Sequence, residues 1–122
     1  LEGGRQMGRQ TAAQMPFSKI YPLLVNKAVR KGRAKGEVDE VIRWLTGYSQ
    51  GEIDALAAGE GSYAAFFEGA PRMNPNREKI SGTVCGVRVE AVEDPLLQEI
   101  LRLDKLVDEL AKGRPLDAVL RT

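Results

Sequence analysis

Histidine is absent from this chain of 122 residues, and cysteine and tryptophan each occur once. Without an imidazole, the chain has neither a histidine general base nor a histidine-ligated metal site. The single cysteine, Cys85, excludes an intrachain disulfide and a cysteine-rich metal site, and it suits the reducing cytoplasm. The sequence therefore predicts no metal site, no cofactor and no recognisable catalytic residues.

Long apolar runs and a strong net charge are also missing. No run approaches the roughly 20 residues that span a bilayer, so we expect no membrane association. Eighteen Lys and Arg against seventeen Asp and Glu leave a net charge of +1, which provides no global field to attract nucleic acid. The length fits one soluble domain, for which we expect a cytoplasmic location.

The first fourteen residues are rich in glycine, glutamine and arginine and have almost no large apolar side chain. Such a segment buries too little surface to offset its ordering entropy, which predicts a disordered arm over residues 1–14. The letters GGRQMGR at 3–9 also look vector-derived in part. We expect a single helical domain over residues 15–122.

Helix start and stop signals divide the first half of that domain. Ser18 is the expected N-cap of a first helix that ends at Gly32. A second helix is predicted over 35–46, because acidic residues crowd its first turns and Gly47 follows its last apolar residue.

Two further short helices should follow. Ser49 and Glu52 have the spacing of a capping box, which predicts a helix that ends near Gly59. Ser62 can cap another short helix that carries most of the aromatic residues. The letters GAPRMNPN at 69–76 then predict a loop.

Residues 77–93 are ambiguous. The letters TVCGVRVE at 83–90 are rich in β-branched residues and partly alternate, which suits a strand. A single strand would have no partner, so we expect a helical or irregular buried segment, with β structure as the alternative. Cys85, between valine and glycine, is expected to be a small buried residue.

The clearest helix is predicted over 95–112. Asp94 is its N-cap, Pro95 its first residue and Gly113 its stop. Leucines cover a face broader than one helix contact needs, so either this helix is central or part of it meets a second subunit. The predicted fold class is all-α, a compact bundle of five to six short helices with an irregular or β segment near 80–90.

A basic cluster lies at the junction of the first two predicted helices, where five of nine residues are Lys or Arg. A helix pair with cations at its joint can contact a phosphate backbone. Glu52 and Asp54 in the helix that would read the bases repel phosphate, so cations that complement a helix end are the preferred interpretation. The candidate nucleic-acid contacts are Lys27, Arg30, Lys31, Arg33 and Lys35.

A second polar group surrounds the proline- and asparagine-rich loop. Arginines beside asparagines can bind a carboxylate or phosphate through paired hydrogen bonds, whereas internal ion pairs with nearby acids are the competing interpretation. The candidate ligand-binding residues are Arg72, Asn74, Asn76, Arg77 and Arg88.

Seven blocks of the sequence carry a resemblance to a known family. They are MPFS at 15–18, KGR at 31–33, EVD at 37–39, WLTGY at 44–48, NPNR at 74–77, VCGVRVE at 84–90 and DKLVDELAKG at 104–113. In this order they resemble the uncharacterised bacterial family called domain of unknown function 2200, over about 15–121, with Gly36 a mild departure. The resemblance implies a small, cytoplasmic, stand-alone bacterial protein with a mainly helical fold, and it supplies no catalytic residues.

These features favour a non-catalytic protein-interaction or regulatory module that self-associates, or binds another protein, through the leucine-rich helix. Nucleic-acid binding through the basic cluster is the first alternative. The second is a small-anion binder, or an enzyme, that uses Arg77 and Arg88 with a carboxylate.

Overall fold

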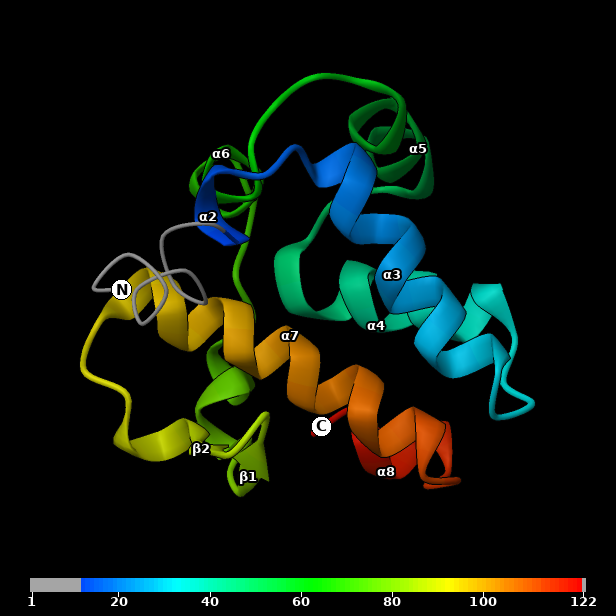
Figure 1. Cartoon of the computed structure of the whole chain (residues 1–122), viewed down its shortest axis with the longest axis vertical. Coiled ribbons are helices and arrows are strands. Elements are labelled where there is room, and N and C mark those ends of the chain that lie inside the picture. The colour runs from blue at the N-terminus through cyan, green and yellow to red at the C-terminus, as the bar shows by residue number, and fades with distance from the viewer. Residues whose placement is uncertain (1–11, 122) are drawn as a thin grey trace, which may run out of the picture.

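The computed structural model of the chain describes residues 12–121. Figure 1 shows α7 crossing the molecule, with α3 and α4 on one side and a small hairpin on the other. The mainly helical prediction is confirmed for this part of the chain. Its elements are α2 (Ala12–Gln14), α3 (Phe17–Val29), α4 (Lys35–Thr46), α5 (Gln50–Ala58), α6 (Tyr63–Glu68), η2 (Pro75–Lys79), β1 (Thr83–Val84), β2 (Val87–Arg88), η3 (Val89–Ala91), α7 (Pro95–Ala111) and α8 (Leu116–Val119).

Helix α7 is central because it is apolar on two sides. Leu103, Leu106 and Leu110 are fully buried in the main core, where α3 and α4 pack against them. Leu101 belongs to a second, smaller cluster with buried residues of the hairpin region, and Leu97 packs partly buried against it. The breadth of the leucine face is therefore explained within one chain.

Several helix ends follow the sequence signals. Helix α4 spans the predicted 35–46 and stops at Gly47, which has a left-handed φ of 79°. Ser49 and Glu52 make both hydrogen bonds of a capping box, at 2.8 and 3.1 Å. Asp94 accepts a hydrogen bond from the backbone of Leu96 at the start of α7.

Ser18 was the wrong choice of N-cap. Helix α3 begins at Phe17, with Pro16 in the capping position and no side-chain cap. The backbone N–H of Phe17 instead donates to the carbonyl oxygen of Gly61 at 2.8 Å, within a bridge that pairs Pro16 with Ser62. A free N–H at the start of α3, for which a local side-chain cap was predicted, is thus satisfied by a residue distant in the sequence.

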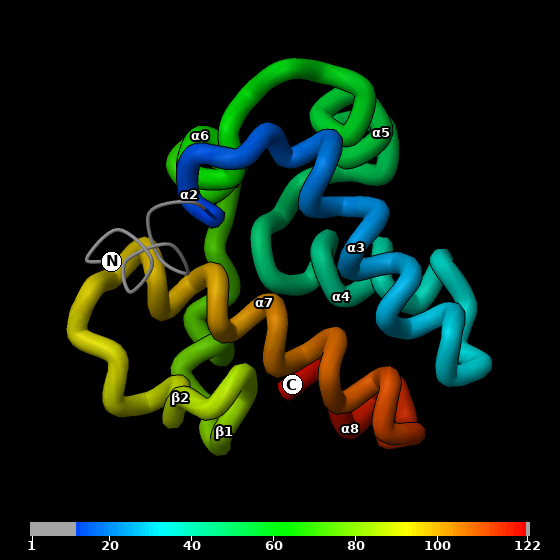
Figure 2. The backbone as a smooth tube through the Cα atoms, in the orientation of Figure 1, coloured from blue at the N-terminus to red at the C-terminus, as the bar shows by residue number. Residues whose placement is uncertain are grey.

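Part of the predicted disordered arm, residues 12–14, is helical. Residues 12–14 form α2, which lies beside α6 in Figure 2, and Ala13 packs against the core. Alanine favours a helix and its methyl group needs little space, so this segment can pack where longer polar residues would not. The rest of the segment for which an arm was predicted, residues 1–11, lies outside the described residues.

The ambiguous segment contains a hairpin. Val84 pairs with Val87 and Thr83 with Arg88, which leaves Cys85 and Gly86 as a two-residue turn. Both turn residues have positive φ, 53° and 75°, as a type I′ turn requires. The first strand therefore has its partner within the same run of residues. Because it occupies the turn, Cys85 is exposed rather than buried.

Candidate ligand-binding pocket

The WLTGY segment builds the end of α4. The Thr46 hydroxyl donates to the carbonyl oxygen of Ile42 at 2.7 Å and accepts the backbone N–H of Tyr48 at 3.2 Å. The Tyr48 hydroxyl donates to the carbonyl oxygen of Phe66 in α6 at 2.7 Å. These bonds end the helix and fix the direction in which the chain leaves it.

The loop after α6 completes this helix end. The backbone N–H of Arg72 donates to the carbonyl oxygen of Thr46 at 3.0 Å, and that of Asn74 donates to Leu45 at 2.9 Å. Terminal helix carbonyls lack partners within their own helix, so the loop supplies them. A Cβ atom on Gly47 would lie only 3.0 Å from backbone atoms of Arg72. Glycine is therefore needed here for space as well as for its left-handed φ.

A pocket of about 340 Å³ lies where these two segments meet, and its lining residues are Trp44, Gly47, Arg72, Asn74 and Pro75. Trp44 is half-buried in the last turn of α4 and packs against the core, whereas Arg72 is exposed. The Asn74 side-chain oxygen accepts the backbone N–H of Asn76 at 2.9 Å, so its amide nitrogen is left as a donor. The volume is near the lower end of the roughly 300–1,000 Å³ typical of ligand pockets.

The side chains of this pocket combine an aromatic surface with hydrogen-bond donors. Arg72 has no ion pair with any residue between 12 and 121. Five other arginines do pair with carboxylates at 3.3 Å or less: Arg33, Arg77, Arg102, Arg114 and Arg121. A guanidinium group and an amide next to an indole ring suit an anion with a flat apolar body.

A sequence profile for a bacterial family, described as "Uncharacterized protein conserved in bacteria" (domain of unknown function 2200, DUF2200), matches residues 11–121. The chain belongs to this family. It is also similar to the crystal structure of the uncharacterized protein SP1917, with 45% sequence identity, a TM-score of 0.87 and coverage of 91% of each chain. No curated protein matches the chain. The DUF2200 match confirms the predicted family resemblance and assigns no activity.

Within this DUF2200 chain, the five predicted ligand-binding residues have different places. Arg72 and Asn74 line the pocket, and Asn76 holds the Asn74 side chain. Arg77 pairs with Glu99 at 2.8 Å and donates to the backbone carbonyl oxygen of Asn74 at 2.9 Å, so it links the loop to α7. Arg88 lies on β2, mostly exposed and 3.9 Å from Glu90, and it is not part of this lining.

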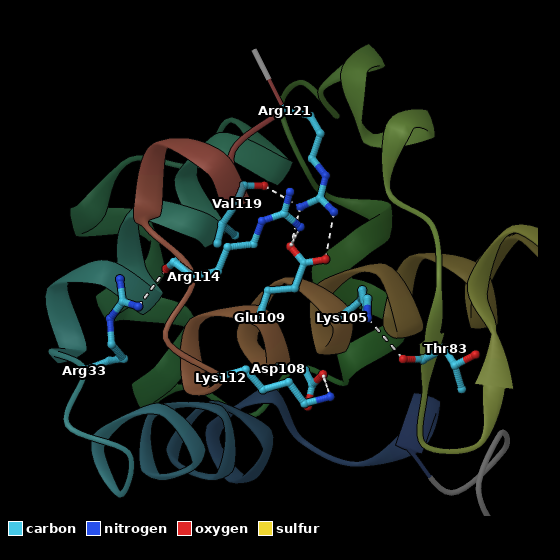
Figure 3. Close-up of polar contacts among 9 residues, drawn as sticks. All are labelled: Arg33, Thr83, Lys105, Asp108, Glu109, Lys112, Arg114, Val119 and Arg121. Atoms are coloured by element: carbon cyan, nitrogen blue, oxygen red, sulfur yellow. Dashed lines mark hydrogen bonds and ion pairs between the residues drawn. The ribbon is translucent and has the colours of Figure 1, made fainter.

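The basic cluster is partly neutralised by internal ion pairs. Lys27 lies 3.5 Å from Asp108, Arg33 pairs with Glu37 at 2.7 Å and Lys35 pairs with Asp39 at 2.9 Å. The Arg33 guanidinium also donates to two backbone carbonyls near the end of α7, one of which is drawn in Figure 3. Arg30 and Lys31 are exposed and have no ion pair with the described part of the chain.

The hydrogen bond of Arg33 changes the titration of its partner. It is the largest of the effects that lower the pKa of Glu37 to about 2, and a hydrogen bond from the backbone of Ala34 adds to it. Glu37 is therefore charged at neutral pH, and Arg33 is held as a structural residue rather than presented to an external phosphate.

The predicted ligand-binding residues did not include three that line the pocket: Trp44, Gly47 and Pro75. In the sequence, Trp44 stands out only as part of the WLTGY block of the family resemblance. The sequence signal that could have indicated this pocket is that WLTGY and NPNR, which supply most of its lining, both belong to the blocks of the DUF2200 resemblance. Nothing in their separation along the chain indicated that they meet.

The described residues add two further observations. Between residues 12 and 121, no three or more His, Cys, Asp or Glu side chains are grouped so that they could hold a metal ion. Within the same range, no helix has both the length and the apolar character needed to cross a membrane.

Proposed function

We propose that this DUF2200 protein is a binding module whose pocket at Trp44, Arg72 and Asn74 takes a small anion with a flat ring. The observation that carries the proposal is the Arg72 guanidinium, which lacks an ion pair in the described chain and lies on a pocket walled by Trp44. A carboxylate or phosphate would bind the arginine through charge-assisted hydrogen bonds, and the ring would lie against the indole.

The surroundings of Arg72 favour binding of an external ligand over an ion pair within the chain. The backbone of Arg72 is held against the end of α4 by the hydrogen bond to Thr46, while its side chain is exposed. A fixed backbone limits the conformational entropy that is lost when a ligand orders the side chain. The backbone of Asn74 is held in the same way, by its hydrogen bond to the carbonyl oxygen of Leu45.

Trp44 provides a direct measurement because it is the only tryptophan in the chain. Phenyl phosphate and benzoate, titrated separately, should change its fluorescence saturably, and their relative affinities distinguish phosphate from carboxylate recognition. Inorganic phosphate and acetate should bind more weakly because they lack the ring. Benzamidine, a flat cation, should not bind.

Arg72→Gln tests the role of the guanidinium. Binding of the preferred ring-bearing anion should weaken by roughly tenfold or more, because a hydrogen bond to a charged group contributes about 1.5–3 kcal/mol. Arg30→Gln is the matched control, since Arg30 is also exposed and without an ion pair in the described chain but does not line the pocket. Equal responses to benzamidine and phenyl phosphate, or unchanged affinity in Arg72→Gln, would overturn the proposal.

Self-association is a second candidate function, and it would use α3 instead of α7. Leu23 and Val29 are 58% and 47% exposed on α3, and they are two of the three large hydrophobic residues classed as exposed in the described chain. Lys19 and Arg30 lie four and seven residues from Leu23 and share its exposed face, whereas Val29 lies about 120° around the helix. A pair of such faces would bring like charges together, so dimerisation should strengthen as salt screens them.

Light scattering during size-exclusion chromatography tests this candidate at low and high salt. A dimer that forms more readily at high salt, and that Leu23→Asp abolishes, would support it. A strict monomer at high concentration in both buffers would exclude it. Retention on a phosphate resin that is lost as salt rises would favour the nucleic-acid alternative through Arg30 and Lys31 instead.

A further inference from the structure

A second pocket, of about 290 Å³, lies between the hairpin and the first half of α7. Its walls are mostly aliphatic and include Val87, Leu97 and Leu101. Asp104 is its acidic residue, no basic residue between 12 and 121 lines it, and Cys85 in the hairpin turn lies at the same pocket. The site is thus an apolar cavity with one carboxylate, distinct from the donor-rich pocket at Trp44.

Asp104 differs from the other shielded carboxylates on the helices. It forms neither a hydrogen bond nor an ion pair with residues 12–121, although it is only partly accessible to solvent. The others have cationic partners: Asp39 with Lys35 at 2.9 Å, Glu99 with Arg77 at 2.8 Å, Asp108 with Lys112 at 3.1 Å, and Glu109 with Arg121 at 2.6 Å. Figure 3 shows the last two of these pairs.

The electrostatic surroundings agree with a carboxylate that lacks a partner. Burial raises the pKa of Asp104 above its ordinary value, with Lys27 opposing and Asp108 adding to the change. The Tyr63 hydroxyl is buried without a hydrogen-bond partner in the described chain. Burial, and then the charge of Asp104, raise the pKa of Tyr63. Lys27, the cation that opposes the change in the pKa of Asp104, lies 3.5 Å from Asp108.

We propose that this pocket binds a small aliphatic primary amine, with its ammonium group paired to Asp104 and its hydrocarbon body between Val87, Leu97 and Leu101. An ammonium group supplies both the opposite charge and the hydrogen-bond donors that the carboxylate lacks. The aliphatic walls favour a hydrocarbon body over a polar one. A fatty acid of the same length would place two carboxylates together, and an alcohol would leave the charge uncompensated.

Cys85 reports on occupancy of the pocket, because it is the only cysteine, is exposed and lines the cavity. Its alkylation by iodoacetamide is followed by mass spectrometry of the intact full chain at neutral pH. The probes are hexylamine, hexanol and hexanoate, which share a six-carbon chain. Hexylamine should slow alkylation at concentrations roughly tenfold lower than hexanol, since a charge-assisted bond is about twice as strong as a neutral one. Hexanoate should protect least.

Asp104→Asn should remove the advantage of hexylamine over hexanol while leaving protection by hexanol. Asp117→Asn is the matched control, because Asp117 is an exposed aspartate on α8 that does not line the cavity. Equal protection by hexylamine and hexanol in the unmodified chain would overturn the proposal. So would an unchanged preference for hexylamine in Asp104→Asn. Trp44 fluorescence should stay constant throughout, which separates this site from the anion pocket.

Discussion

Arg33 donates a hydrogen bond of 3.1 Å from Nη1 to the carbonyl oxygen of Leu110, 77 residues later in the chain. The same group donates to the carbonyl oxygen of Arg114 at 2.7 Å, while the other guanidinium nitrogens bind Glu37. The backbone N–H of Gly113 also donates to the Leu110 carbonyl oxygen, so Arg33 adds a second hydrogen bond there and one to Arg114 just beyond α7. One side chain thereby joins the α3–α4 connection to the α7–α8 connection.

Arg33→Lys should lower the free energy of unfolding by about 1–2 kcal/mol, because lysine cannot bind Glu37 and two carbonyls at once. Urea unfolding measures the change. Arg30→Lys, in the same cluster but without an ion pair in the described chain, should change stability by less than about 0.5 kcal/mol. Equal effects of the two substitutions would show that the Arg33 contacts add no stability.

Glu37 should make part of the stability sensitive to acid. Because Arg33 and the backbone of Ala34 lower its pKa from 4.5 to about 2, its stabilisation is complete above the ordinary pKa and is lost as the pH falls toward 2. Glu37→Gln should cost about 1 kcal/mol at neutral pH, as expected for a partly exposed ion pair. Urea midpoints measured from pH 7 to 2 should converge for the two proteins. A difference that stays constant with pH contradicts this assignment.

Gly47→Ala should destabilise the protein by about 1–3 kcal/mol, because a left-handed φ is unfavourable for alanine by about 1–2 kcal/mol and its Cβ would also crowd Arg72. Gly36→Ala is a control of opposite sign. No atom lies within 4 Å of the added Cβ at Gly36, which lies within α4. This substitution should therefore stabilise by about 0.5–1 kcal/mol. Thermal unfolding of both variants measures the two effects.

Tyr21→Phe should remove a hydrogen bond to a buried charge. The Tyr21 hydroxyl donates to Asp39, which is 3% exposed and also binds Lys35 and Gln50. The expected loss is about 1.5–3 kcal/mol in urea unfolding. Tyr48→Phe is the comparison, because its hydroxyl donates to a neutral carbonyl and its loss should be only about 0.5–1.5 kcal/mol. A larger loss of unfolding free energy in Tyr48→Phe than in Tyr21→Phe would contradict the stronger hydrogen bond assigned to Tyr21 and Asp39.

Asp104→Asn should stabilise the protein at neutral pH. The folded-state pKa of Asp104 is raised, mainly by burial, so the native carboxyl is most favourable below its ordinary pKa of 3.8 and becomes costly as it ionises. Lys27 of α3, Asp108 of α7 and Tyr63 of α6 are the charged or titratable groups that interact with it. The variant should have the higher melting temperature at pH 7, with the difference shrinking in acid. A lower melting temperature at pH 7 would mean that Asp104 has a stabilising partner.

Helix ends were predictable where their hydrogen bonds are local. Gly47, the Ser49–Glu52 capping box and Asp94 act within a few residues of the chain, so their spacing is visible in the sequence. Ser18 was wrong because Gly61 satisfies the Phe17 N–H from another part of the chain. The hairpin was missed because only two residues separate its strands, so both lie within one short run of the sequence.

By itself, the sequence determined the class of fold, the ends of most helices, the DUF2200 family and the absence of imidazole chemistry. Only the tertiary structure decided which polar groups remain without partners. Arg77 and Arg72 belong to the same loop region, yet Glu99 of α7 neutralises one and leaves the other exposed. Whether a charge is paired depends on residues brought together by folding, and their distance along the chain does not encode that contact.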